Sequence, residues 1–391
     1  MTPAARISAA IEILDAIGAG TPAEKALTGW ARRSRFAGST DRAAVRDHVF
    51  DALRRRRSFA ALGGSEDGRG LMIGALRSDG APIEDVFTGA RHAPAPLTEA
   101  EHAHLARAPE LTEGEALDCP DWLIPQLRDS LGADFAAVMA RQRQRAPVFL
   151  RANLLRATRD AAQAALKDEG IATRPSPLCD TALEVTLNAR RVHTSVAFAQ
   201  GLVELQDAAS QAVIATLPTP RRGPVLDFCA GGGGKALALA ARLNAPILAH
   251  DANPARMRDL PARAARAGAE VEILPAPSLA GHYPLVLVDA PCSGSGSWRR
   301  SPAAKWTLTP ERLAELRQQQ AAILDTAADL VAPGGHLAYV TCSLLQGEND
   351  AQIDALRARD PRWQEVLRRS FTPLDGGDGF FVAVLAAASG V

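Results

Sequence analysis

The stretch that decides the fold begins at residue 225. It reads Val225-Leu226-Asp227-Phe228, a short apolar strand, then Cys229-Ala230-Gly231-Gly232-Gly233-Gly234-Lys235, a glycine-rich turn, and then an Ala- and Leu-rich helix. Ile247-Leu248-Ala249-His250-Asp251 follows as a second apolar strand. A strand, a tight turn, a helix and another strand in this order predict a βαβ unit, whose two strands lie parallel in one sheet.

The same alternation continues towards the C-terminus. We expect strands at 271–274, 285–289, 336–340 and 380–385, and helices at 256–267, 310–331 and 349–357. Alternating strands and helices are typical of a doubly wound, mostly parallel α/β sheet. The sequence therefore predicts a Rossmann-like α/β domain over residues 218–391.

Two smaller regions precede this domain. Residues 1–118 are predicted to form an all-α domain with a linker, because apolar residues recur at three- and four-residue steps from Ile7 to Ile17. Residues 119–217 are predicted to form a small α+β module, with a strand at 149–153, a helix at 161–167 and strand-like pieces at 183–186 and near Val192. The chain is thus predicted to be a multidomain protein.

One predicted helix of the first region ends in four arginines. Thr40-Asp41 would cap this helix, which runs through Leu53 into Arg54-Arg55-Arg56-Arg57. Two interpretations of the run stay open: a solvated helix end whose cations suit the helix dipole, and a patch that contacts phosphate.

The overall charge and the cysteines narrow the class of protein. Lys plus Arg and Asp plus Glu both total 44 among 391 residues, which excludes a strongly basic chain that binds nucleic acid indiscriminately. Five cysteines without a Cys-x-x-Cys pair argue against a disulfide framework or a zinc site, so we expect a cytoplasmic protein without metal. Glu12 and Asp15 interrupt the apolar stretch that a signal peptide needs, and no apolar run reaches the roughly 18 residues of a membrane span.

The glycine-rich turn predicts a cofactor site. Glycines at the start of a helix let the backbone approach a ligand closely, and Asp251 ends the next strand, where a carboxylate can accept hydrogen bonds from a ribose. The turn is not a Walker A loop, because Cys229 and Ala236 stand where that motif needs Gly and Ser or Thr. A dinucleotide, S-adenosylmethionine and a merely structural turn all remain open here.

Two cysteines follow neighbouring strands of the predicted sheet. Asp289-Ala290-Pro291-Cys292 ends one strand and Thr341-Cys342-Ser343 ends the next, so both thiols are expected at the carboxyl edge of the sheet. A thiolate that adds to carbon 6 of cytosine makes carbon 5 nucleophilic, and an acid at ring nitrogen 3, where Asp289 is placed, stabilises the adduct. One cysteine can be the covalent nucleophile while the other assists release. The alternative is two buried structural cysteines.

At these residues the chain resembles the RsmB/Sun family of RNA cytosine-5 methyltransferases, and most closely its bacterial 16S ribosomal RNA branch. The segment from Asp289 to Gly296 with Arg299-Arg300-Ser301-Pro302 and Lys305-Trp306 looks like the family's fourth motif, and Thr341-Cys342-Ser343 with Glu348-Asn349 looks like its sixth. The resemblance extends to Val203–Gln211, to Asp378-Gly379-Phe380-Phe381 and to the N-terminal region, which is similar to the family's NusB-like RNA-binding domain.

The resemblance implies a role for each site residue. Cys342 would be the nucleophile, Cys292 would promote breakdown of the adduct, and Asp289 would contact the cytosine and border the methyl donor. S-adenosylmethionine would be held by Asp289, by Asp251 and by the turn, namely Cys229, Ala230, Gly231, Gly232, Gly233, Gly234 and Lys235. The chain departs from the family at Gly232, where Pro is usual, and at residues 274–279, which lack the usual Asp of the third motif.

Further residues of the fourth motif have two interpretations. Arg299, Arg300 and Trp306 could meet phosphate and a base face of the RNA, or Trp306 could simply pack in a core. Domains 1–118 and 119–217 would both bind RNA, and the protein would act as a monomer away from membranes. We expect methylation of 16S ribosomal RNA at cytosine carbon 5. The alternatives are a transfer RNA cytosine-5 methyltransferase and a non-catalytic ribosome-assembly factor that binds RNA.

Overall fold

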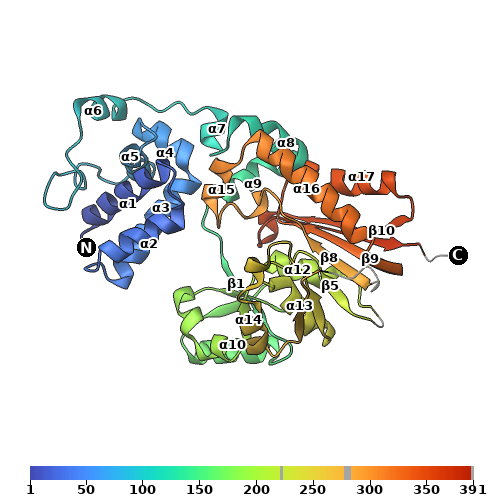
Figure 1. Cartoon of the computed structure of the whole chain (residues 1–391). Coiled ribbons are helices and arrows are strands. Elements are labelled where there is room, and N and C mark those ends of the chain that lie inside the picture. Colours follow the sequence, from blue (N-terminus) through green and yellow to red (C-terminus); the bar gives the residue numbers. More distant parts are fainter. Residues whose placement is uncertain (221–222, 277–282, 389–391) are drawn as a thin grey trace. The chain divides into compact units, whose positions relative to one another are not determined.

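A computed structural model describes residues 1–220, 223–276 and 283–388 (Figure 1). Its contacts divide the chain into two compact units. The first, here called the helical unit, contains Met1–Arg128, Gly132–Arg145 and Trp298–Thr307; the second, the sheet unit, contains Asp129–Leu131, Ala146–Ser297 and Leu308–Val391. The domain boundaries expected from the sequence stay predictions. The grouping of Trp298–Thr307 with the N-terminal residues was not expected.

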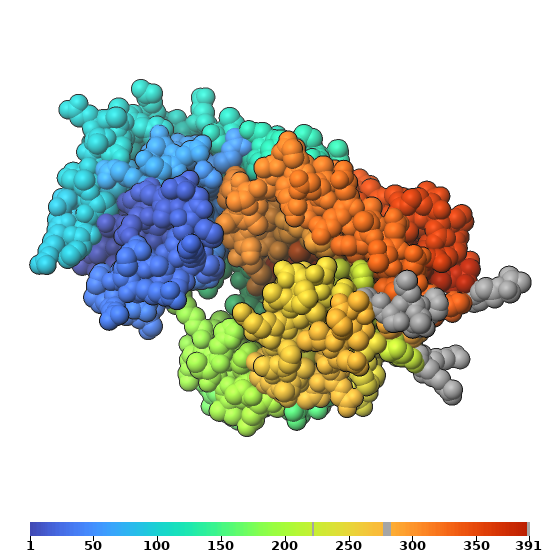
Figure 2. Space-filling model, in the orientation of Figure 1, coloured from blue at the N-terminus to red at the C-terminus, as the bar shows by residue number. Residues whose placement is uncertain are grey.

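The helical unit is made of short helices around one apolar core. Its helices are α1 (Pro3–Gly18), α2 (Ala23–Arg33), α3 (Ser39–Arg54), α4 (Arg56–Gly63), α5 (Gly68–Ser78), α6 (Glu99–Leu105), α7 (Glu113–Ala116), α9 (Phe135–Gln142), α15 (Pro302–Thr307) and most of α8 (Ile124–Leu131). Ile13, Val45, Val49, Phe59 and Ile73 are buried in this core. The space-filling view shows the blue helices packed closely on one another (Figure 2). The N-terminal region is therefore helical, as predicted.

The predicted cap of α3 is wrong. The helix begins at Ser39, with Gly38 at its N-cap, so Thr40 and Asp41 lie inside its first turn. Asp41 instead forms an ion pair with Arg6 of α1 at 2.8 Å. The carboxylate links two helices, and this tertiary contact could not be read from the local sequence.

The sheet unit contains a small antiparallel sheet with strand order β2-β3-β1-β4. Its strands are β1 (Val148–Ala152), β2 (Thr173–Pro175), β3 (Ala182–Val185) and β4 (Val203–Leu205), and α10 (Arg159–Asp168) and α11 (Val196–Ala199) lie in the same segment. The strand predicted near Val192 is wrong, because residues 189–194 form a short 3₁₀ helix. Val192 is nevertheless buried in the core of this small sheet.

The large sheet has seven strands in the order β10-β11-β9-β8-β5-β6-β7. They are β5 (Val225–Asp227), β6 (Ile247–Ala249), β7 (Val271–Ile273), β8 (Tyr283–Asp289), β9 (Val331–Thr341), β10 (Trp363–Phe371) and β11 (Phe380–Ala387). Strands β5 to β9 pair in parallel, whereas β10 and β11 are antiparallel, so the prediction of a mostly parallel sheet is confirmed. The edge strand β10 was not predicted, because its polar residues hide the usual apolar signal.

Helices α12 (Ala208–Thr216), α13 (Gly234–Leu243), α14 (Leu260–Ala267), α16 (Pro310–Ala328) and α17 (Asp350–Arg359) complete the sheet unit. Apolar side chains of α12 and α13 share one core with β5, β8 and β9, and those of α16 and α17 share a second core with the same sheet. Helices on both faces leave the carboxyl ends of the parallel strands as the place for a site.

The register of the central strands brings those ends together. Asp227 of β5 lies opposite Leu287 of β8, and Asp289 of β8 lies opposite Val340 of β9. The segments that follow β5, β8 and β9 therefore start side by side at one edge. They contain the glycine-rich turn, Cys292 and Cys342.

Candidate active site

The two predicted cysteines meet at this edge. The Sγ atoms of Cys292 and Cys342 lie 3.4 Å apart, within hydrogen-bond range for sulfur. All five cysteines of the chain are free thiols, and the distance is far longer than the roughly 2.05 Å of a disulfide. Both residues are partly exposed, so the pair is open to a substrate.

The surroundings of the two thiols differ. A hydrogen bond donated by Cys292 lowers the pKa of Cys342, and the ammonium of Lys235 favours its thiolate further. The same hydrogen bond raises the pKa of Cys292 well above its ordinary value, and burial and the nearby Glu348 carboxylate add to this. Cys342 is therefore the thiol that ionises first, and the thiolate is the nucleophilic form of cysteine.

Lys235 and Asp289 form an ion pair beside the thiols. Nζ of Lys235 lies 2.7 Å from Oδ2 of Asp289, and the lysine side chain is 9% exposed. Burial is the largest single influence on the pKa of Lys235 and lowers it, but the charge and hydrogen bond of Asp289, together with Cys342 and Asp227, outweigh burial and raise the lysine pKa. Asp289 keeps 33% of its side chain exposed, so it is accessible to a ligand.

A buried glutamate holds both cysteine loops. Glu348 is completely buried, and its Oε1 accepts hydrogen bonds from the Ser293 amide at 2.8 Å and from Nε2 of Gln320 at 3.0 Å. Its Oε2 accepts hydrogen bonds from the hydroxyls of Ser293 and Ser343, both at 2.5 Å. Ser293 follows Cys292 and Ser343 follows Cys342, so one carboxylate fixes the backbone beside each thiol.

A close approach of two backbones also fixes the Cys292 loop. The amide of Gly296 donates to the Cys342 carbonyl at 2.9 Å, and the amide of Gly379 donates to the Gly296 carbonyl at 2.9 Å. A Cβ atom on Gly296 would lie 2.1 Å from the carbonyl oxygen of Gly379, a distance too short for two atoms that are not bonded to each other. Gly296 is therefore required by this packing.

The glycine-rich turn lies at the start of α13, as expected. Gly233 has φ = +79°, and a Cβ atom there would lie 2.2 Å from Cδ1 of Leu260, so only glycine fits. Asp251 is buried, and its Oδ2 accepts a hydrogen bond from the Gly231 amide at 2.9 Å. Arg151 of the small sheet donates to the carbonyl of Gly234 at 2.9 Å, which ties the end of the turn to β1.

Asp227 was not predicted as a site residue. It ends β5, is fully buried, and neither of its carboxylate oxygens makes a hydrogen bond to a described residue. Burial, together with the nearby carboxylates of Asp289 and Asp251, raises its pKa to about 7. The sequence feature that could have identified Asp227 as a site residue is its position immediately before the turn, at the carboxyl end of the first parallel strand.

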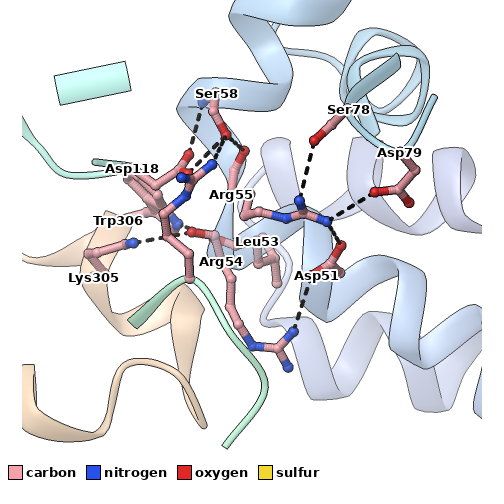
Figure 3. Close-up of polar contacts among 11 residues, drawn as sticks. Asp51, Leu53, Arg54, Arg55, Ser58, Ser78, Asp79, Asp118, Lys305 and Trp306 are labelled. Carbon is pink, nitrogen blue, oxygen red and sulfur yellow. Dashed lines mark hydrogen bonds and ion pairs between the residues drawn. The ribbon is translucent and has the colours of Figure 1, made fainter. Parts of the chain in front are cut away.

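Each arginine of the run has a hydrogen-bond or ion-pair partner within the helical unit. Arg54 is buried, Arg55 pairs with Asp51 at 2.6 Å, Arg56 pairs with Glu66 at 3.3 Å and Arg57 pairs with Asp121 at 2.6 Å. Figure 3 shows Arg54 and Arg55 directed to partners in the same unit. Arg54 is therefore not a solvated side chain, whereas Arg56 and Arg57 pair with carboxylates that are 79% and 70% exposed, so the phosphate interpretation of these two residues stays a prediction.

Two of the fourth-motif residues that could have met RNA are directed into the protein, whereas Arg300 is partly exposed and its contact with RNA stays a prediction. Arg299 is 2% exposed, and Trp306 donates from Nε1 to the Leu53 carbonyl at 2.6 Å. Packing is thus the interpretation that the structure supports for Trp306. Of the third-motif segment 274–279, positions 277–279 lie outside the described residues.

Two family profiles match the chain. One, described as 16S rRNA methyltransferase RsmB/F, covers residues 214–386, and the other, a RsmF/B-like ferredoxin-like domain, covers residues 119–192. The chain belongs to the RsmB/F family. The RsmB/F relatives include the Ribosomal RNA small subunit methyltransferase B of Salmonella arizonae and that of Salmonella typhi. Each is 34% identical over 287 residues, which cover 68% of this chain and 66% of the relative, just under two thirds of its length.

Solved structures share the fold of this RsmB/F chain. The protein PH0851 matches 98% of this chain and 99% of its own, at a TM-score of 0.77 and 24% identity. NSun6 from Pyrococcus horikoshii, solved with SFG, matches 69% of this chain and 99% of its own, at a TM-score of 0.62 and 17% identity. The motif-based resemblance and the Rossmann-like methyltransferase domain are confirmed.

The cofactor expected for an RsmB/F methyltransferase, S-adenosylmethionine, fits the residues at this edge. Its sulfonium and amino groups are cationic, and the carboxylates of Asp227, Asp251 and Asp289 surround the turn. Asp227 offers two buried oxygens without partners, and Gly231 and Gly233 keep the turn free of side chains. The comparison with the family confirms the cofactor class, whereas its individual contacts stay predictions.

Residues 1–220, 223–276 and 283–388 contain no group of three or more His, Cys, Asp and Glu side chains placed to hold a metal ion. Within the same residues, no helix combines the length and the apolar character that crossing a membrane requires.

Proposed function

We propose that this protein transfers a methyl group from S-adenosylmethionine to carbon 5 of a cytosine in RNA, with small-subunit ribosomal RNA as the substrate. The observation that carries the proposal is the 3.4 Å contact between Cys292 and Cys342 at the carboxyl edge of the sheet. A cofactor turn alone would fit many methyltransferases. Two unequal thiols beside it fit covalent activation of a pyrimidine ring.

Each site residue has a step in this mechanism. The Cys342 thiolate adds to carbon 6 of the cytosine while ring nitrogen 3 takes a proton from solvent. The Asp289 carboxylate, held by Lys235, accepts a hydrogen bond from that N–H and stabilises the adduct, and nitrogen 3 gives the proton back once carbon 5 is methylated. When bound, S-adenosylmethionine supplies an electrophilic methyl group for carbon 5. A base then takes the carbon 5 proton, the bond between carbon 6 and sulfur breaks, and Cys342 leaves as a thiolate. Cys292, in contact with that sulfur, assists the release.

The cofactor contacts follow from the turn. Cys229, Ala230 and Gly231 to Lys235 would line the methyl donor, and Asp251 would accept hydrogen bonds from its ribose. The Asp251 carboxylate also binds Arg256 at 3.0 Å, which holds it at the start of the next loop. Lys235 would act at the border between donor and cytosine, since it contacts Asp289.

The remaining parts of the chain would bind the RNA. The similarity of residues 1–118 to a NusB-like domain and the small sheet of residues 119–217 support this assignment, and a monomer would suffice. The target base must leave its stack to reach the thiols. A ribosomal RNA substrate, which the names of the relatives favour, places the protein in the cytoplasm.

The test is methyl transfer from labelled S-adenosylmethionine to unmodified 16S ribosomal RNA, with mapping of the modified base. Wild-type protein should label carbon 5 of a cytosine, and Cys342→Ala should lose the label but still bind the cofactor. Cys292→Ala should accumulate an RNA adduct linked to the protein through Cys342, visible on denaturing gels. Full activity of Cys342→Ala would refute the mechanism. Label on transfer RNA alone would change the substrate, and cofactor binding without any label would favour a non-catalytic assembly factor.

A further inference from the structure

The helical unit contains a segment that comes from the catalytic part of the sequence. Residues 298–307 lie between β8 and β9 in the chain, yet they pack with the N-terminal helices. Trp298, Arg299 and Lys305 of this segment are at most 2% exposed, and they are among the largest fully buried side chains of the protein. Burial of two cations in a ten-residue segment calls for specific partners.

The segment binds the C-terminal end of α3. Trp306 donates from Nε1 to the Leu53 carbonyl at 2.6 Å, and Nζ of Lys305 donates to the Arg54 carbonyl at 3.3 Å (Figure 3). The last carbonyls of a helix lack partners within the helix, and the helix dipole favours a cation there. Lys305 and Trp306 therefore satisfy two carbonyl groups that α3 leaves open.

The helical unit also holds the other end of the segment. Nε of Arg54 donates to the Arg299 carbonyl at 2.9 Å, and the Arg299 amide donates to Oε1 of Gln142 at 3.0 Å. These two contacts and the two at the end of α3 fix both ends of residues 299–306. The contacts join residues that are up to 253 positions apart in the chain.

A buried carboxylate lies beside Lys305. Burial lowers the pKa of Lys305 to about 8, and the fully buried Asp118 carboxylate offsets part of this effect because it favours the charged lysine. The same carboxylate accepts hydrogen bonds from the Ser58 amide at 2.8 Å and from Nε of Arg143 at 2.7 Å. Figure 3 shows Asp118, Ser58 and Lys305 gathered beside the end of α3. Lys305 therefore belongs to a connected polar cluster inside the helical unit with Asp118, Ser58 and Arg143. This cluster, together with the end of α3 that binds Lys305 and Trp306, is here called the anchor.

The anchored segment continues directly from the Cys292 loop. Ser295 belongs to the hydrogen-bonded loops of the active site, since its hydroxyl accepts from the Leu344 amide at 2.8 Å. Ser297 is the last residue of the sheet unit and Trp298 the first of the segment. Only two residues, Gly296 and Ser297, lie between Ser295, which is held beside the thiols, and Trp298, where the segment bound by α3 begins.

We propose that Lys305 and Trp306 are positioning residues, through which the helical unit restrains the loop that carries Cys292. The N-terminal unit then contributes to catalysis itself, besides any contact that it makes with RNA. This inference rests on the proposed function for its catalytic consequence. Its structural content, restraint of the Cys292 loop by α3, can be tested without RNA or cofactor.

The experiment measures initial rates of alkylation by iodoacetamide at each cysteine of the full chain, read by peptide mass spectrometry. Trp306→Phe removes the indole N–H and keeps an aromatic ring, and Lys305→Met removes the ammonium and keeps the aliphatic stem. Each variant should raise the alkylation rate of Cys292 about fivefold, the factor that corresponds to one hydrogen bond of typical net strength. Cys229, in the cofactor turn, should keep its rate and serves as the internal reference.

Two controls separate restraint of the loop from general loosening of the helical unit. Trp30→Phe changes a buried tryptophan in the core of the same unit, away from the anchor, and should leave Cys292 unchanged. Cys119 is fully buried in the helical unit, so its alkylation reports opening of that unit. In Trp306→Phe its rate should stay at the wild-type value.

The catalytic readout uses the same variants. Multiple-turnover reactions of Trp306→Phe should show about fivefold more adduct between Cys342 and RNA at steady state, with unchanged affinity for S-adenosylmethionine. Unchanged Cys292 alkylation in both folded variants would overturn the proposal. So would a parallel rise at Cys119 and Cys292. If wild-type protein transfers no methyl group, the proposed function fails while the alkylation result still decides this inference.

Discussion

Replacement of Glu348 should disable the site without changing cofactor binding. This carboxylate accepts three hydrogen bonds from the two loops that follow β8 and β9 and a fourth from Gln320 of α16. In Glu348→Ala, the Ser293 amide loses its acceptor in a fully buried place, and so does one of the two N–H groups of Gln320 Nε2, while the other keeps the Pro291 carbonyl at 2.9 Å. The two hydroxyls can turn to other acceptors. A buried unsatisfied donor costs about 1–3 kcal/mol, so the two donors together cost about 4 kcal/mol.

That free energy sets the size of the effect. At about 1.4 kcal/mol per factor of ten, 4 kcal/mol lowers the population of the ordered thiol pair by up to about a thousandfold. Glu348→Gln keeps one oxygen for the two N–H donors and loses only the charge. Hydrogen bonds to charged groups are roughly twice as strong as neutral ones, so we expect a loss of about tenfold.

The assay is the single-turnover rate of adduct formation between Cys342 and RNA, alongside the dissociation constant of S-adenosylmethionine. The matched control is Glu204→Gln, because Glu204 is also buried but pairs with Arg266 at 2.7 Å, away from the cysteine loops. Glu204→Gln should lower stability and leave the adduct rate of the folded fraction unchanged. A wild-type adduct rate in folded Glu348→Ala would refute the reasoning.

Three further predictions concern the same edge of the sheet. The pKa of Asp227 is about 7, above its ordinary value, so the folded state holds a proton that the unfolded state releases, and stability falls as pH rises from about 4 to 7. Thermal unfolding of Asp227→Asn should show a gain over wild type that grows between pH 5 and pH 8 by about 3 kcal/mol, and equal pH dependence of the two proteins would contradict this. Lys235→Met removes the ammonium that favours the Cys342 thiolate, so the midpoint of the pH dependence of adduct formation should rise by about one pH unit. A midpoint equal to that of the wild type would contradict this prediction. Gly296→Ala should lower the free energy of unfolding by several kcal/mol, because its Cβ would lie 2.1 Å from the Gly379 carbonyl oxygen. The control is Gly80→Ala, whose Cβ would have no atom within 4 Å; its φ of +64° should cost about 1 kcal/mol.

Much of the fold and of the site chemistry could be predicted from the local sequence. The strands from β5 to β9 are apolar runs that end in turn residues, so their order and their carboxyl ends could be predicted, and with them the edge where Cys292 and Cys342 meet. The glycines of the turn follow from the same logic, because only they allow the backbone at Gly233. Polar β10 escaped prediction because an edge strand buries little apolar surface.

The tertiary structure decided how charged side chains are used. The local sequence from Arg54 to Arg57 does not indicate whether these arginines contact water, phosphate or other residues of the protein. Their partners are as distant in the chain as Asp121 and Arg299. Glu348 gains its role from two loops that follow different strands, and Lys305 from the end of α3. Periodicity and turn chemistry depend on neighbours along the chain, whereas ion pairs and buried hydrogen bonds depend on neighbours in space. The sequence alone therefore determined which groups could react, and only the folded chain decided which groups hold them in place.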